Sequence, residues 1–152
     1  MQTDGGGLAP VGVARQSPGD VFAHQRRGVV GARAERGVKK EIVVGHDYRS
    51  YSASIKLALV TGLMAAGCKV HDIGLCMSPM AYFAQFELDV PCVAMVTASH
   101  NDNGWTGVKM GANRPLTFGP DEMTRLKEIV LNGQGVAREG GKLVRVEDFR
   151  EK

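Results

Sequence analysis

The sequence has no long apolar run and few cysteines, and each shortage excludes a class of protein. No stretch of the 152 residues approaches the roughly 20 consecutive apolar residues of a membrane-spanning helix, so we predict no membrane partner. The three cysteines, Cys68, Cys76 and Cys92, form no Cys-x-x-Cys pair. This pattern argues against a disulfide framework and against a zinc ribbon. A reducing, cytoplasmic location is the expectation that follows.

Basic charge is also missing from most of the chain, although the formal net charge is +3 at pH 7. Residues 1–40 hold seven Lys and Arg against three acids, a net charge of +4, while residues 41–152 hold 12 against 13, a net charge of −1. Phe22 is the one aromatic residue of the basic end. Without a domain-wide basic surface or a stacking platform, nucleic-acid binding ranks last among the functions considered.

Residues 1–38 lack a sustained apolar period. Asp4 and Gly5–Gly7 stand where a secretion signal has its basic start and apolar core, so secretion is not expected. A transit peptide stays as the targeting alternative, because arginines outnumber acids. Ordering a backbone costs about 1–2 kcal/mol per residue, and this glycine-rich segment has little apolar surface to offset that cost. We therefore predict a disordered leader, with a short helix over Val29–Arg36 as the alternative.

From Lys39 onward, short apolar runs alternate with helical patterns, which is typical of an α/β fold in a chain long enough for about one domain. The predicted elements are a strand at 41–45, a helix at 52–66, a strand at 68–73, a helix at 78–86, strands at 91–96 and 105–110, and a helix at 120–131. This order predicts a mixed, mostly parallel sheet with flanking helices. Residues 134–152 are interpreted as a polar tail with one apolar stretch, Leu143–Val146.

The chemistry is concentrated in VTASHNDNGWTGVKMG, residues 96–111, which follows a predicted buried strand. Open α/β sheets bind their ligands at the carboxyl ends of strands. Ser99 is a weak nucleophile alone, but His100 titrates near neutrality and can orient or relay a proton. Lys109 supplies a point charge of the kind that binds phosphate. Asn103-Gly104 predicts a two-residue reversal that returns the next strand alongside Ser99, with Lys109 facing the same pocket.

A Ser-His pair in a loop is by itself more typical of a turn than of catalysis. The longer string is more specific, because T-A-S-H-N at 97–101 followed by N-G-x-x-G-x-K at 103–109 closely resembles the catalytic serine loop of the α-D-phosphohexomutases, the phosphomannomutase and phosphoglucomutase family. Val44–Arg49 resembles the V-G-x-D-x-R that follows the first strand of these enzymes. Residues 39–133 as a whole resemble the N-terminal domain, the first of four.

The resemblance implies an isomerase that transfers a phosphoryl group on hexose phosphates. It implies that Ser99 is the phosphorylated serine and that its phosphate is also a Mg²⁺ ligand. His100 and Lys109 resemble the other catalytic residues, for proton transfer and charge stabilisation, and Arg49 and Asn101 resemble substrate-binding residues. Hexose 1,6-bisphosphate is the implied activator. For Arg49, a structural ion pair or loop anchor is the alternative.

The sequence departs from the family pattern in four ways. Asp102 stands where many members have proline, and residues 1–38 contain no aromatic-rich first motif. No Asp-x-Asp of the family's magnesium loop occurs, and the length leaves no room for the other domains. We therefore expect one domain of a larger mutase, inactive alone, with most Mg²⁺ ligands and its partner domains elsewhere. The alternative is a standalone module that binds phosphosugars, or is phosphorylated, without turnover.

Overall fold

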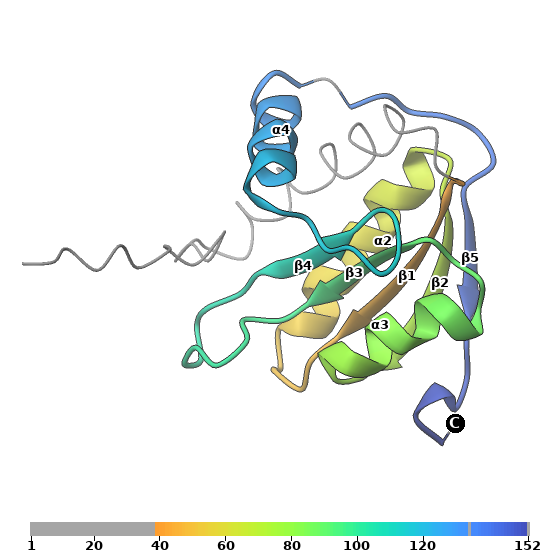
Figure 1. Cartoon of the computed structure of the whole chain (residues 1–152), viewed down its shortest axis with the longest axis vertical. Coiled ribbons are helices and arrows are strands. Elements are labelled where there is room, and N and C mark those ends of the chain that lie inside the picture. Colours follow the sequence, from red (N-terminus) through yellow and green to blue (C-terminus); the bar gives the residue numbers. More distant parts are fainter. Residues whose placement is uncertain (1–38, 134, 152) are drawn as a thin grey trace, which may run out of the picture.

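The computed structural model describes residues 39–133 and 135–151, and the predicted disordered leader lies outside them. Five strands form one sheet in the order β4-β3-β1-β2-β5 (Figure 1). The strands are β1 (Glu41–His46), β2 (Lys69–Leu75), β3 (Cys92–Val96), β4 (Val108–Gly111) and β5 (Lys142–Arg145). The helices are α2 (Ser52–Ala65), α3 (Ser78–Glu87), α4 (Pro120–Leu131) and the 3₁₀ helix η1 (Phe149–Glu151). Because β1–β2, β1–β3 and β2–β5 are parallel and β3–β4 is antiparallel, the predicted mixed, mostly parallel sheet is confirmed.

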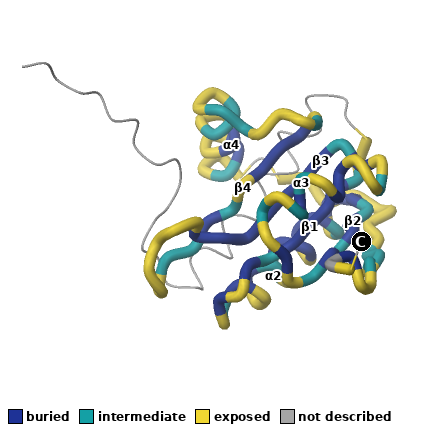
Figure 2. Tube along the Cα trace, turned by 60° about the horizontal axis from the view of Figure 1, so that its bottom comes forward, coloured by how far each residue is buried: buried dark blue, intermediate teal, exposed yellow. Residues whose placement is uncertain are grey.

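Helices cover both faces of this sheet, which gives three layers. Ile42 and Val44 of β1 pack with α2 residues such as Leu59 on one face, where α4 adds Leu126. Val43, which alternates with them, packs on the other face with Ala81 and Ala84 of α3. Figure 2 shows the resulting band of buried backbone along β1 and β3. A strand buried on both faces reads as a continuous apolar run, which is why β1 and β3 were recognisable in the sequence.

Glycine and proline end and begin the helices as expected. Gly67 follows α2 with a φ of +79°, and a Cβ atom there would lie 2.7 Å from the Glu139 carbonyl oxygen, so this turn requires glycine. Pro79 lies in the first turn of α3. At the start of α4, the Gly119 N–H donates to the Glu122 carboxylate at 2.9 Å, which satisfies one of the free donors of the first turn.

Two parts of the sheet differ from the prediction. The strand expected at 105–110 begins only at Val108, because residues 97–107 form a loop whose base is closed by a Thr97 N–H to Gly107 O bond of 3.0 Å. Asn103-Gly104 is a turn inside this loop rather than a two-residue hairpin. Within the predicted tail, β5 pairs in parallel with β2. This four-residue edge strand is too short for a periodic signal, and the predicted boundary at residue 133 stays a prediction.

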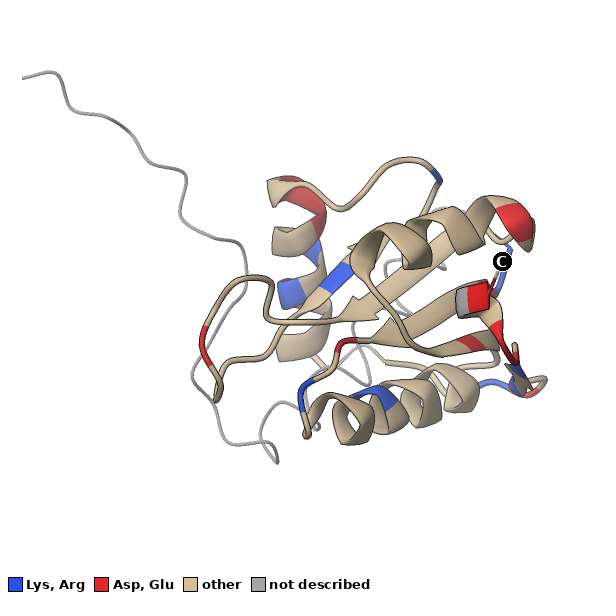
Figure 3. Cartoon of the chain, turned by 90° about the horizontal axis from the view of Figure 1, so that it is seen from below, with Lys and Arg blue, Asp and Glu red and all other residues tan. Residues whose placement is uncertain are grey.

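The helices carry little charge. Lys56 is the single charged residue of α2, and Glu87 is that of α3 (Figure 3). Neither helix therefore presents the basic stripe that is typical of nucleic-acid binding. In the described part of the chain, no helix combines the length and apolar character needed to cross a membrane.

Candidate active site

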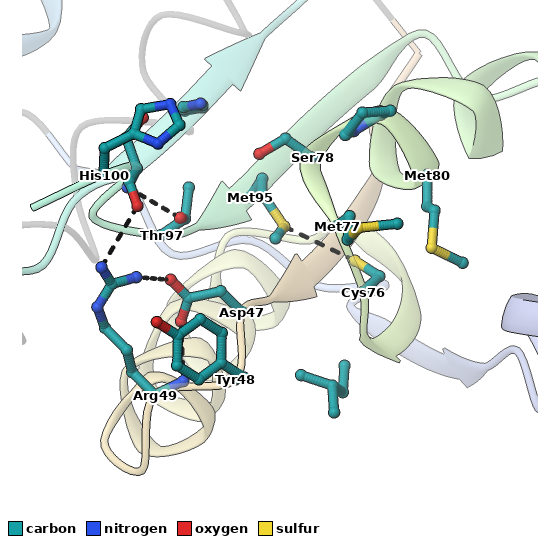
Figure 4. Close-up of a pocket in the computed structure, with 14 residues that line it drawn as sticks. Asp47, Tyr48, Arg49, Cys76, Met77, Ser78, Met80, Met95, Thr97 and His100 are labelled. Atoms are coloured by element: carbon teal, nitrogen blue, oxygen red, sulfur yellow. Dashed lines mark hydrogen bonds and ion pairs between the residues drawn. The ribbon is translucent and has the colours of Figure 1, made fainter.

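A pocket of about 770 Å³ lies at the carboxyl ends of β1, β2 and β3 (Figure 4). In that view, polar side chains lie on one side of the pocket, and they are Asp47, Arg49, Thr97 and His100. Sulfur-containing side chains lie on the other side, and they are Cys76, Met77, Met80 and Met95. Ser99 and Lys109 also line the pocket. The site is thus polar on one side and apolar on the other.

The sheet topology places the pocket there. α2 connects β1 to β2 over one face, and α3 connects β2 back to β3 over the other face, so the direction of winding reverses between β1 and β3. In open α/β sheets, ligands bind in the crevice at such a switch point. The Asp47 N–H donates to the Val96 carbonyl at 3.0 Å, which ties the ends of β1 and β3 together at this place.

Ser99 has a left-handed backbone, with a φ of +56°. A residue other than glycine rarely adopts this conformation, which costs about 1–2 kcal/mol, and such residues concentrate at functional sites. Two bonds hold the conformation, since the Ser99 N–H donates to the Thr97 hydroxyl at 3.0 Å and the Asn101 N–H donates to the Ala98 carbonyl at 3.1 Å. The Ser99 side chain is consequently presented at the surface of the pocket.

His100 and Lys109 reach the same pocket from different elements. His100 follows Ser99 in the loop and is exposed. Lys109 is exposed on β4 opposite Met95 of β3, and residues paired in this way point to the same face. The structure therefore brings Ser99, His100 and Lys109 together as the sequence predicted, while their catalytic roles stay predictions.

Arg49 is buried under the loop, with 6% of its surface exposed. Its guanidinium forms an ion pair with Asp47 and donates to the carbonyl oxygens of Ser99 at 3.3 Å and Asn101 at 2.5 Å. These contacts are those of the loop anchor that the sequence analysis kept as the alternative. Asn101 does not line the pocket, and its side chain donates to the Ala98 carbonyl at 2.8 Å. Substrate binding by Arg49 and Asn101 stays a prediction.

Asp47 is the centre of the network beneath the loop. It is buried, and its carboxylate accepts bonds from the Arg49 guanidinium and from the Ser52 hydroxyl at 2.5 Å. Burial raises the pKa of this carboxyl, but hydrogen bonds from Ser52, Thr97 and Arg49 outweigh burial, and its pKa lies below the ordinary value. Asp47 is therefore a carboxylate at neutral pH. The sequence analysis singled out neither Asp47 nor Thr97 as a site residue, although the Asp-x-Arg spacing carried the signal.

Cys76 contributes to the apolar side of the pocket. Its thiol lies 3.7 Å from the Met95 sulfur, and burial raises its pKa to about 11. Since the thiolate is the reactive form of cysteine, Cys76 stays a protonated, unreactive thiol near neutral pH. The pocket therefore has one hydroxyl nucleophile of interest, Ser99, and no competing thiolate among the residues described.

The residues that the structure describes do not make up a magnesium site. Among them, no group of three or more His, Cys, Asp or Glu side chains could hold a metal ion. Asp47 is the carboxylate that lines the pocket, and its oxygens are occupied by Arg49 and Ser52. A carboxylate committed to two donors is a poor ligand for an ion that demands near-ideal octahedral oxygen geometry.

Comparison with known proteins identifies the family. The family model for "Phosphoglucomutase/phosphomannomutase, alpha/beta/alpha domain I" matches residues 22–136, and so begins before the boundary predicted at Lys39. A "Probable phosphoglucosamine mutase" of Pyrococcus furiosus is 38% identical over 89 residues, which are 59% of this chain and 20% of that protein. The "Phosphomannomutase" of Escherichia coli is 51% identical over 70 residues, which are 46% of this chain and 15% of that protein.

A solved structure agrees with the sequence matches. The phosphoglucomutase/phosphomannomutase family protein of Burkholderia thailandensis superimposes with a TM-score of 0.72 and 26% identity, over 86% of this chain and 29% of its own. The matches thus cover about a fifth of the curated relatives and under a third of this solved chain. On its strand order, its serine loop and these matches, the chain belongs to the phosphoglucomutase/phosphomannomutase family and has the fold of its α/β/α domain I.

Proposed function

We propose that this chain is the catalytic-serine domain of a phosphohexomutase, an isomerase that moves a phosphoryl group between two hydroxyls of a hexose phosphate by way of Ser99. The placement of Ser99 carries the proposal. It is exposed, held in a left-handed conformation, and shares a pocket at the sheet's switch point with His100 and Lys109. The relatives named as phosphomannomutase and phosphoglucosamine mutase support the same class of reaction.

In the proposed step, a hydroxyl oxygen of the sugar attacks the phosphorus of phosphorylated Ser99. A new phosphorus–oxygen bond forms to the sugar, the bond to Ser99 Oγ breaks, the sugar hydroxyl gives up its proton to His100, and Ser99 Oγ takes up a proton. The return step moves the other phosphoryl group of the resulting bisphosphate to Ser99. Negative charge spreads over the transferring oxygens, so the Lys109 cation stabilises the transition state. It also stabilises the resting phosphoserine, which carries about −1.5 to −2 charges.

The proposal includes groups outside the described residues. Ser99, His100 and Lys109 are all exposed, so this pocket holds a substrate from one side only. Efficient transfer needs the reacting atoms held about 3–3.5 Å apart. We propose that further mutase domains complete the site and supply most ligands of Mg²⁺, that hexose 1,6-bisphosphate is the activator, and that the chain alone does not turn over. A cytoplasmic location belongs to the same proposal.

The alternative is a module that binds phosphosugars, or is phosphorylated, without turnover. One observation favours it, namely that the matches cover about a fifth of the curated relatives. A mutase assay on the purified chain separates the two functions only in combination with a phosphorylation assay, because both functions predict an inactive isolated chain.

The decisive experiment is incubation of the chain with glucose 1,6-bisphosphate and Mg²⁺, followed by peptide mass spectrometry. We expect one phosphoryl group on the peptide that contains Ser99. Ser78 is the matched control, because it lines the same pocket: Ser78→Ala should still be labelled, and Ser99→Ala should not. Label spread over Ser78, Thr97 and Thr106, or no label at all, would overturn the proposal. Transfer of the label onward to glucose 6-phosphate would favour the mutase over the module.

A further inference from the structure

The loop that carries Ser99 is held at a second point, far from the serine. The Tyr51 hydroxyl donates to the Trp105 carbonyl at 2.7 Å and accepts from the Gly104 N–H at 3.1 Å. The Tyr51 ring packs against the core cluster beneath α2, so the hydroxyl is presented from a fixed base. One side chain therefore satisfies two backbone groups at the tip of the loop.

Tyr51 has no local role that would explain it. It occupies the N-cap position of α2, where Ser, Thr, Asp and Asn are preferred because their side chains cap the helix. The Tyr51 side chain makes no capping bond. The segment is closed instead by the Ser52 hydroxyl on Asp47 and the Ser52 N–H on the Arg49 carbonyl. The hydroxyl of Tyr51 thus serves the loop and not the helix.

Arg49, two residues earlier, holds the other part of the same loop. Its guanidinium bonds the carbonyls of Ser99 and Asn101, while Tyr51 bonds the backbone of Gly104 and Trp105. The segment between β1 and α2 therefore grips the loop on both sides of its unsupported stretch. That stretch needs support, because Gly104 has a φ of +96° and open space around it, and a glycine there leaves the backbone otherwise free.

We infer that Tyr51 is a positioning residue for the Ser99 loop, which it restrains from outside the pocket. The inference rests on the proposed function of Ser99. Phosphoryl transfer depends mainly on positioning and charge stabilisation, so a loop that wanders slows the transfer even when every catalytic side chain is present. Tyr51 does not line the pocket, and it acts only through the loop backbone.

The test compares the full chain with Tyr51→Phe, which removes the hydroxyl and keeps the ring. Tyr82→Phe is the matched control, since Tyr82 lies on α3 and outside the pocket. Hydrogen exchange read by mass spectrometry should show the peptide over residues 100–107 exchanging about fivefold faster in Tyr51→Phe, as expected for the loss of one or two hydrogen bonds. The initial rate of Ser99 phosphorylation by glucose 1,6-bisphosphate should fall about tenfold. The half-saturating bisphosphate concentration should not change, because no pocket group is lost.

Each outcome decides the inference or the function beneath it. Unchanged exchange in Tyr51→Phe overturns the inference, and so does faster exchange with an unchanged phosphorylation rate. Equal changes in Tyr82→Phe, or a lowered urea midpoint that accounts for the faster exchange, also overturn it. Absence of phosphorylation in the unmodified chain overturns the proposed function, and the exchange result then decides alone whether Tyr51 holds the loop.

Discussion

Gly45 on β1 lies directly against Cys76, at the point where β2 ends. A Cβ atom on Gly45 would come 2.5 Å from the Cys76 sulfur and 3.3 Å from Cγ1 of Ile73. The backbone is fixed there as well, because the Cys76 N–H donates to the His46 carbonyl at 2.9 Å. The absence of a side chain at Gly45 thus lets the segment that opens the apolar side of the pocket approach β1.

Gly45→Ala should destabilise the chain by about 1–3 kcal/mol, the usual cost of forcing an extra methyl group into a packed interior. Urea unfolding followed by circular dichroism measures the effect. Combining it with Cys76→Ala, which vacates the sulfur position, should recover part of the loss, because two residues in contact do not act independently. Strict additivity of the two changes would show that the contact does not limit the packing.

Asp47→Asn should lower the free energy of unfolding at pH 7 by about 3–5 kcal/mol, because it leaves the buried Arg49 without its counter-charge. The folded pKa of Asp47 lies below its ordinary value of 3.8, so its stabilisation is complete above that pH and is lost as the pH falls toward the folded value. The loss should therefore shrink below about pH 4.

Urea unfolding between pH 7 and pH 2.5 measures this dependence. Asp89→Asn is the control, because Asp89 also pairs with an arginine, Arg114, and has a lowered pKa, but is exposed. Its effect at pH 7 should be much smaller than that of Asp47→Asn. Equal effects would contradict the claim that burial makes the Asp47–Arg49 pair important.

Ser99→Gly should be more stable than Ser99→Ala by about 1 kcal/mol, since glycine adopts a φ of +56° without the steric cost that alanine bears. Thermal unfolding of the two variants side by side gives the difference, and both lack the hydroxyl, so its loss cancels. If alanine proved as stable as glycine, the left-handed conformation of residue 99 would be in doubt.

Leu63→Ala should cost about 2–5 kcal/mol, because Leu63 is 2% exposed in the core beneath α2. Leu57→Ala on the same helix is the matched control, since Leu57 is 63% exposed and should change stability by no more than about 0.5 kcal/mol. Chemical denaturation compares them. A large effect at Leu57 would mean that this surface is covered in the protein.

Much of this fold was legible in the sequence because its elements are long, apolar and clearly delimited. β1 and β3 are continuous apolar runs, and Gly67 and Pro120 mark helix boundaries by their backbone requirements. The meeting of Ser99 and Lys109 followed from a reversal after β3, even though the true connection is a longer loop.

The missed features depend on contacts between distant residues. Tyr51 and Trp105 are 54 positions apart, and nothing in the composition around Tyr51 distinguishes its hydroxyl from that of any half-buried tyrosine. β5 depends wholly on β2 for its hydrogen bonds, and two of its four residues are charged. Such features arise from tertiary packing, which local propensity does not encode.

The register of β3 against β4 determines which side chain the edge strand offers to the pocket. Lys109 pairs with Met95, and its neighbours Val108 and Met110 pair with Val96 and Ala94. β4 lies at the end of the sheet, where β3 alone fixes its position. A slip of one residue turns every side chain of a strand to the opposite face. The number of residues between Val96 and Val108 is thus an electrical parameter of the site: a one-residue insertion or deletion taken up by the pairing would replace a cation with an apolar side chain while leaving every catalytic residue in the sequence.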